Sequence, residues 1–177
     1  MKKIVLMVVL LIALVGCDGN TQMMNEVLDN NIETVEQMLN DGTDVNERNG
    51  YGWTALMHAA RAGNYEIAKL LIERNADVNA LDSYERSPLI RAVFAEQKDI
   101  VVLLLENGAD VNHADEMGRA PLHWSITRGE PEIAKVLLEH GADFTMKTND
   151  DWTPRGLAGK EAEIEILNML QDAGAKY

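Results

Sequence analysis

Apolar residues recur along the chain at helical spacing, and the whole pattern repeats every 33 residues. In each unit an isoleucine is followed by apolar residues three and four positions later: Ile67/Leu70/Leu71, Ile100/Leu103/Leu104, Ile133/Val136/Leu137 and Ile166/Met169/Leu170. This spacing predicts a buried stripe on an amphipathic helix. A fixed period of about 20–50 residues is typical of stacked supersecondary units, so we expect a repeat architecture.

A shorter helix is expected to precede this one in each unit. Thr54, Ser87 and Thr153 stand at its start, where a hydroxyl can accept a backbone N–H as the N-cap. Ala120 takes the same place without a cap oxygen, although a proline follows it, and proline suits the first position of a helix.

Glycine marks the expected ends of both helices. Gly63 and Gly129 end the short helix, and Glu96 takes their place in the third unit. A left-handed backbone at Glu96 would cost about 1–2 kcal/mol, because a side chain is crowded there. The longer helix is expected to end at one C-cap residue per unit: Asn75, Gly108, Gly141 and Gly174.

These residues resemble the ankyrin repeat, whose helices open with Gly-x-Thr-Pro-Leu-His-x-Ala-Ala and close with Gly-Ala-Asp-Val-Asn. Here the motif stands as GWTALMHAA, ERSPLIRAV, GRAPLHWSI and DWTPRGLAG, followed by NADVN, GADVN and GADF. The family histidine is present only as His123; Met57, Ile90 and Gly156 replace it. The resemblance implies an all-α solenoid of helix-turn-helix units with β-hairpin-like turns.

We expect this ankyrin-repeat domain to span residues 23–177. Its five repeats would cover residues 23–48, 49–81, 82–114, 115–147 and 148–177. The first repeat lacks a turn, and the last has Gly156 and Gly159 in its first helix and a strongly polar second helix. Polar terminal repeats keep a solenoid soluble, so both ends are interpreted as caps.

Residues 1–16 differ from the repeats and resemble a bacterial lipoprotein signal peptide. Lys2 and Lys3 precede the apolar run Ile4–Val15, which is short for a membrane span of about 20 residues. Leu14-Val15-Gly16-Cys17 resembles a lipobox, which implies that Cys17 becomes a lipidated N-terminus and that residues 17–22 form a short tether. The alternative is an ordinary signal peptide with an incidental cysteine.

Asp18 follows the cysteine and resembles the inner-membrane retention signal of enteric bacteria. We therefore expect the protein in the bacterial cell envelope, lipid-anchored on the periplasmic face, with the inner membrane favoured. Several acyl chains would anchor it stably, whereas a single chain binds membranes only marginally.

Charge and composition exclude several functions. The net charge of −13 becomes −15 when residues 1–16 are removed with Lys2 and Lys3, which argues against nucleic-acid partners and anionic lipid surfaces. Cys17 is the only cysteine, so no internal disulfide can form. The histidines lack metal-ligand spacing, and no nucleophile elbow or phosphate loop is present. We expect no metal, no cofactor and no enzymatic activity.

The resemblance implies a concave side formed by the turn tips and the first helices. Five of the nine aromatic residues fall there, together with several arginines, and such residue types dominate binding hot spots. The candidate partner-binding residues are Arg48, Tyr51, Trp53, Arg61, Tyr84, Arg86, Phe94, Met117, Arg119, Arg128 and Trp152. In the alternative, Trp53 and Trp152 pack against the next turn, and Tyr51 and Tyr84 shield turn backbone.

The opposite, convex side carries the outer positions of the second helices, which are acidic: Glu66, Glu73, Asp99, Glu106, Glu132 and Glu139. A solvated acidic face explains them equally well.

The function expected from these observations is protein–protein interaction by a monomeric, membrane-anchored periplasmic protein. The resemblance offers an immunity protein against a toxin or lipase effector, or a scaffold or protector of an envelope stress-defence enzyme. Two different classes of function stay open beside these: a purely structural element of the envelope, and an enzyme.

Overall fold

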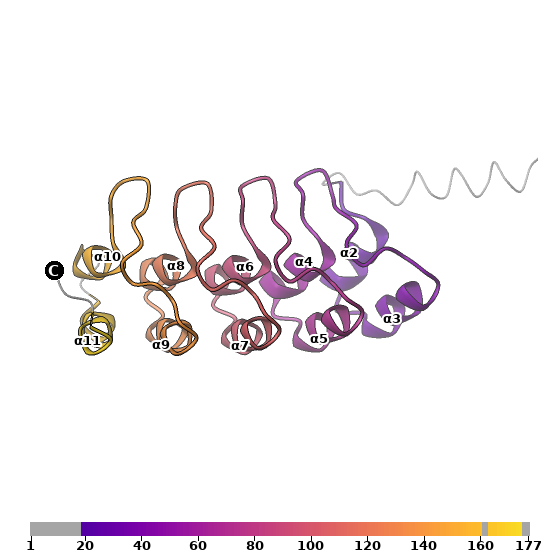
Figure 1. The fold of residues 1–177 in the computed structure, drawn as a ribbon. Coiled ribbons are helices and arrows are strands. Elements are labelled where there is room, and N and C mark those ends of the chain that lie inside the picture. Colours follow the sequence, from indigo (N-terminus) through magenta and orange to yellow (C-terminus); the bar gives the residue numbers. More distant parts are fainter. Residues whose placement is uncertain (1–18, 161–162, 175–177) are drawn as a thin grey trace, which may run out of the picture.

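The computed structural model describes residues 19–160 and 163–174. Its helices form two layers, with the turns standing out from the first layer (Figure 1). The first layer comprises α2 (Gln22–Leu28), α4 (Ala55–Ala62), α6 (Pro88–Phe94), α8 (Pro121–Arg128) and α10 (Pro154–Lys160). The second layer comprises α3 (Ile32–Asn40), α5 (Tyr65–Glu73), α7 (Lys98–Glu106), α9 (Pro131–Glu139) and α11 (Ile164–Asp172).

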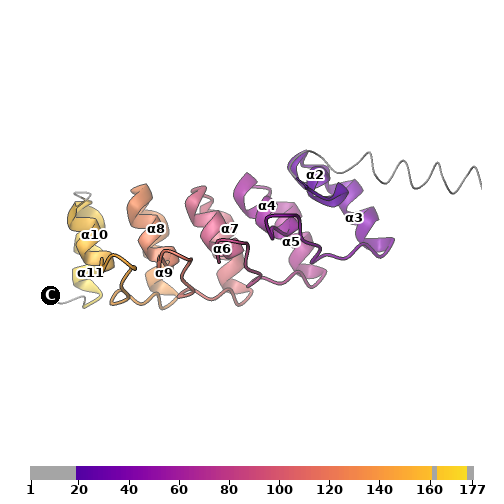
Figure 2. The same ribbon diagram turned by 90° about the horizontal axis from the view of Figure 1, so that it is seen from above.

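The helix pairs follow one another in a single row from α2–α3 to α10–α11 (Figure 2). Each helix packs on its partner and on the equivalent helices before and after it. The described residues contain no strand, so the fold is the all-helical solenoid that the sequence predicts. None of their helices has the length and apolar character needed to cross a bilayer.

The helix starts confirm the predicted caps. The hydroxyl oxygens of Thr54 and Ser87 each accept a backbone N–H from the third residue of the helix, at 3.3 Å. At Ala120 the roles are reversed, because its N–H donates to Nδ1 of His123 at 3.2 Å. His123 is fully buried, and burial lowers the pKa of its imidazole below the usual value. His123, the one copy of the family histidine in this chain, therefore has a structural role.

The helix ends confirm the expected left-handed residues. Gly63 has φ 83° and Gly129 φ 69°, and Glu96 adopts φ 63° although it is not glycine. The Glu96 carboxylate accepts a hydrogen bond from Nε of Arg128 at 3.1 Å. This exposed ion pair links the end of α6 to the end of α8.

One core runs through the stacked repeats, but the buried stripe differs from the predicted one. In α5 the fully buried residues are Ile67, Ala68 and Leu71, whereas Leu70 is half-buried. In α9, likewise, Ala134 is buried and Val136 is half-buried. This shift arises because each second-layer helix packs against its neighbours on both sides as well as on its own first-layer helix, so the position next to the isoleucine faces inward. In α7 the neighbours cover Leu103 as well.

Asparagine side chains link the ends of successive repeats. The Oδ1 atoms of Asn46, Asn79 and Asn112 accept the backbone N–H of the residue 31 positions later, at 2.7–2.8 Å. Their amide groups donate to carbonyl oxygens of the next repeat. Each Asp-Val-Asn sequence is thus a connection between neighbours, which keeps otherwise unpaired backbone groups bonded.

Candidate partner-binding face

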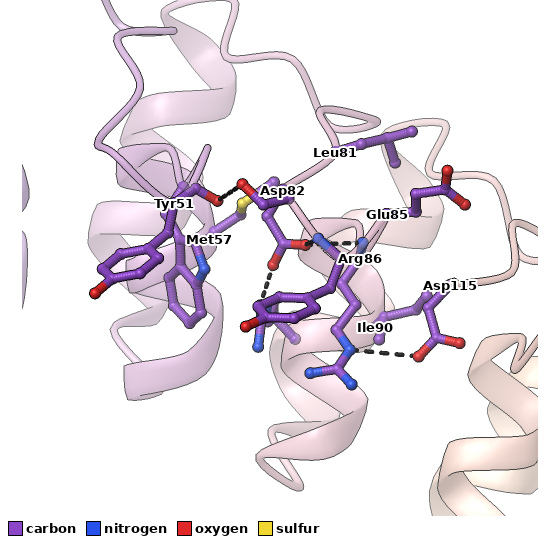
Figure 3. Close-up of polar contacts among 12 residues, drawn as sticks. Tyr51, Met57, Leu81, Asp82, Glu85, Arg86, Ile90 and Asp115 are labelled. Atoms are coloured by element: carbon purple, nitrogen blue, oxygen red, sulfur yellow. Dashed lines mark hydrogen bonds and ion pairs between the residues drawn. The ribbon is translucent and has the colours of Figure 1, made fainter. Parts of the chain in front are cut away.

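The turns are held by the side chain of their own first residue. Oδ1 of Asp82 accepts the N–H groups of Tyr84 at 2.8 Å and Arg86 at 3.1 Å, as Figure 3 shows. Asp115 accepts those of Met117 and Arg119 in the same way, both at 3.0 Å. Because this pattern fixes the turn backbone, it also fixes the direction of the side chains at the tip.

Neighbouring turns are bonded to one another through their backbones. The carbonyl of Tyr51 accepts the N–H of Ser83 at 3.0 Å, and that of Tyr84 accepts the N–H of Glu116 at 3.2 Å. Within each turn, the first residue donates to the carbonyl of the fifth, as in Asp82 and Arg86 at 3.1 Å. These are hairpin-like turns stacked into a ladder, without strands among the described residues.

The second carboxylate oxygen of Asp82 accepts a hydrogen bond from Nη2 of Arg91 in α6. Both residues are buried, and Arg91 is only 8% exposed. The Arg91 guanidinium lies 4.0 Å from the centroid of the Trp53 ring. Burial lowers the pKa of Arg91, Asp82 opposes this shift, and the charges of Arg86 and Arg61 lower the pKa further. These three arginines therefore lie close enough to affect one another.

Asp115 makes an equivalent connection in the next repeat. Its Oδ2 accepts from Nε1 of Trp124 at 3.0 Å and from Nε of Arg86 at 3.3 Å. Figure 3 shows Arg86 reaching across to this carboxylate. Trp124 is buried. Arg91 and Trp124 each stand nine residues after the aspartate that they contact. The same position of the repeat therefore bonds the turn aspartate through an arginine in one repeat and through a tryptophan in the next.

A pocket of about 330 Å³ opens beside these contacts, on the face formed by the turns and the first-layer helices, which the sequence predicts to be the concave face. Arg61, Arg86 and Arg91 line it together with His58 and two asparagines, and Tyr51, Trp53 and Tyr84 supply its aromatic surface. No carboxylate is among its lining residues in the described part of the chain. The second and third repeats thus bring together arginines and aromatic rings that lie up to 40 positions apart.

Trp53 is buried, although the sequence places it among the exposed residues of the turn tips. It is only 8% exposed, and it packs with Met57 and Ala80 in a small apolar cluster. The next turn covers it, and the buried Arg91 guanidinium lies against its ring. Trp53 therefore forms the inner wall of the pocket, which agrees with the packing alternative for this residue.

The other aromatic candidates are exposed. Tyr51 is 56% exposed and Tyr84 46%, whereas Phe94 and Trp152 are exposed by a little over a third. Trp152 lies at the other end of the solenoid and contacts Gly156, where a Cβ would come within 3.3 Å of its ring. The glycine that appeared to weaken α10 thus leaves room for this tryptophan.

Arginines lie against aromatic rings along the whole face. Arg61 is 5.6 Å from the Trp53 ring centroid, Arg86 5.5 Å from that of Tyr84, and Arg119 5.0 Å from that of Trp124. Arg128 is 5.2 Å from the ring centroid of Phe94. At such distances the cation is attracted to the ring face, so these guanidinium groups are oriented before any partner arrives.

The remaining candidates lie outside the pocket. Arg48 is exposed and donates from Nη1 to the carbonyl of Leu81 at 2.6 Å. Met117 and Arg119 belong to the turn of the fourth repeat and are half-buried. Phe94 and Arg128 form a separate cluster with Glu96. The eleven candidates therefore divide into one pocket and several separate contacts along the face.

The predicted acidic positions of the second helices are all exposed on the opposite side of the molecule. One of them, Glu132, pairs with Lys98 at 2.9 Å, and such an exposed pair contributes little to stability. Across residues 19–160 and 163–174, no group of three His, Cys, Asp or Glu side chains could hold a metal ion.

Comparison with known proteins identifies the repeats. A family model described as ankyrin repeats (3 copies) matches residues 23–115. A second, described as ankyrin repeats (many copies), matches residues 104–158. A search of curated proteins finds no match.

Proposed function

The chain belongs to the ankyrin-repeat family, and from that premise we propose that it binds one protein partner through its concave face. Ankyrin repeats imply protein–protein interaction, and the proposal assigns that interaction to a surface. The protein would act as a monomer without a cofactor, and its role would be binding, not catalysis.

The observation that carries this proposal is the pocket between the turns of the second and third repeats. It combines exposed tyrosines with arginines, the residue types that contribute most to binding energy at interfaces. The turn aspartates and the ladder of backbone bonds hold these side chains in place. Little conformational entropy would then be lost on binding, which favours affinity.

Replacing both pocket tyrosines, Tyr51→Ala with Tyr84→Ala, is expected to weaken partner binding about tenfold or more, because two exposed aromatic contacts are lost. The test is capture from cell extracts with the wild-type and variant proteins as baits, followed by affinity measurement with the captured partner. Tyr65→Ala is the matched control, since Tyr65 is also exposed but lies at the start of α5, away from the pocket.

Circular dichroism would verify that each bait is folded. A partner that binds the wild type and the double variant equally well would contradict the assignment to the concave face. Loss of binding in Tyr65→Ala would place the interface on the second-layer helices instead.

We further propose that the protein is anchored in the bacterial envelope through lipid on Cys17 and faces the periplasm. The support is the sequence Leu14–Cys17 behind a basic and apolar leader, with Asp18 favouring the inner membrane. All of these positions lie outside the described residues. Since α2 begins at Gln22, only a few residues would separate the lipid from the first repeat, and the solenoid would lie close to the bilayer.

Cys17→Ala is expected to release the protein from membranes or to block its processing, because the acylated residue is lost. The measurement is the distribution of the protein between membrane and soluble fractions, together with its mass. If Cys17→Ala protein remains in the membrane fraction to the same extent as wild type, the lipid anchor is wrong.

Within the envelope we propose an immunity role, in which the concave face sequesters a toxin or lipase effector. The alternative is a scaffold or protector of a stress-defence enzyme. The identity of the captured protein separates these roles. A protein that captures nothing specific would be a structural element of the envelope.

A further inference from the structure

We propose that the pocket between the turns of the second and third repeats accepts an acidic segment of the partner, with a carboxylate held by Arg61 and Arg86 beside Tyr51 and Tyr84. This inference rests on the proposed function, since it specifies the chemistry of the partner at the same surface. It concerns the pocket alone and not the rest of the concave face.

The first support is the charge of the pocket. Its walls contain three arginines and no carboxylate among the described residues, although the whole chain has a net charge of −13. The nearest carboxylates lie beneath the surface, where Asp82 is paired with Arg91 and Asp115 with Arg86 and Trp124. Glu85 belongs to the same turn, but Figure 3 shows it directed away from Tyr51. Asp82 and Asp115 each neutralise one arginine, so Arg61 leaves the pocket with a net positive charge on an acidic protein.

The second support is that Arg61 and Arg86 have guanidinium N–H groups available for a ligand. Arg61 is exposed and makes no ion pair with another described residue. Arg86 uses Nε for Asp115, and its two Nη atoms make no hydrogen bond to a side chain or carbonyl in the described part of the chain. Both guanidinium groups are oriented by aromatic rings. They can donate charge-assisted hydrogen bonds to an incoming carboxylate, and such bonds are among the strongest polar contacts.

The third support is the size of the pocket and its surroundings. A volume of about 330 Å³ lies at the lower end of the range for ligand sites and suits side chains of a peptide. A nucleic acid requires a continuous basic stripe, whereas here the exposed carboxylates of Glu85 and Glu116 interrupt the row of turns. These carboxylates would repel an extended polyanion, which favours a short acidic segment of a protein.

The test begins with a displayed library of random peptides selected on the immobilised protein lacking residues 1–16. We expect the selected peptides to contain more Asp and Glu than the starting library. The best of them would be labelled, and its Kd measured by fluorescence anisotropy. Replacing its Asp and Glu residues by Asn and Gln should weaken binding at least about tenfold, because the charge-assisted contacts are lost.

On the protein side, Arg61→Gln should weaken binding of the same peptide about tenfold, and Arg61 is exposed, so the fold should be retained. Lys69→Gln is the control, because Lys69 is also an exposed cation of the second repeat but lies on α5, outside the pocket and outside the candidate partner-binding residues. We expect wild-type affinity for this control. Equal losses in both variants would overturn the assignment to this pocket.

Two further outcomes would overturn the inference: selected peptides without acidic enrichment, or single-stranded DNA of about 20 nucleotides binding as tightly as the peptide. Neither result would affect the capture experiment with the tyrosine variants. If a partner is lost on Tyr51→Ala with Tyr84→Ala but binds Arg61→Gln normally, the concave face is retained and only the acidic segment is wrong.

Discussion

Leu104→Ala is expected to lower the free energy of unfolding by about 2–5 kcal/mol, the range observed when a buried leucine is truncated and a cavity remains. Leu104 is fully buried in α7, the middle helix of the second layer. This helix contacts α5, α6 and α9, so a cavity there loosens three contacts at once. Urea unfolding followed by circular dichroism measures the change.

The matched control is Leu28→Ala at the end of α2, where the leucine is 46% exposed. It should cost less than about 1 kcal/mol, as is usual for surface positions. A Leu104→Ala protein as stable as wild type would mean that the second-layer helices do not share the core described above. Because contacts in a solenoid are mainly between neighbours, the variant could also unfold in two steps.

Asp82→Asn is expected to destabilise the protein by about 3 kcal/mol, since it leaves the buried Arg91 guanidinium without its counter-charge. The substitution is mild in every other respect. The amide oxygen of asparagine can still accept the N–H groups of Tyr84 and Arg86, as Asn49 does for Tyr51 and Trp53 in the preceding turn. The loss therefore reports on the ion pair and not on the turn.

The repeat provides its own compensating substitution. His58 stands in the second repeat where Arg91 stands in the third, nine residues after the first residue of the turn. Asp82→Asn combined with Arg91→His recreates the Asn49–His58 combination. We expect this double variant to recover part of the stability lost in either single variant, because no unpaired charge remains buried. Additive losses, or a cost below about 1 kcal/mol for Asp82→Asn, would contradict a strongly coupled pair.

The candidate site could be predicted only in part. Residue type and repeat position indicated that Tyr51, Tyr84, Arg61 and Arg86 belong to one face, and the structure places them around one pocket. The same reasoning assigned Trp53 to that surface, although the following turn covers it. A tip position in one repeat is exposed or buried according to the side chains of the next repeat, which periodicity does not specify.

The buried aspartates were missed for a related reason. Asp82 and Asp115 look like ordinary polar turn residues, yet each connects its turn to a buried partner nine positions later. The signal was present, because the first residue of every turn and its partner recur with the period of 33 residues. The residue nine positions after the first turn residue differs between repeats, however, as His58, Arg91, Trp124 and Leu157, so no single motif reveals the connection.

The repeat architecture, the helix starts and ends, and the separation of an aromatic, arginine-rich face from an acidic one could all be predicted from the residues of single repeats. These features depend on capping, glycine conformation and apolar spacing, which act within one repeat. Which tip side chains meet, in contrast, depends on how the repeats stack. The pocket exists because the turns stack through bonds such as Ser83 N–H to the Tyr51 carbonyl, and because ion pairs with Asp115 and Asp82 hold Arg86 and Arg91 of the third repeat beside the aromatic residues of the second.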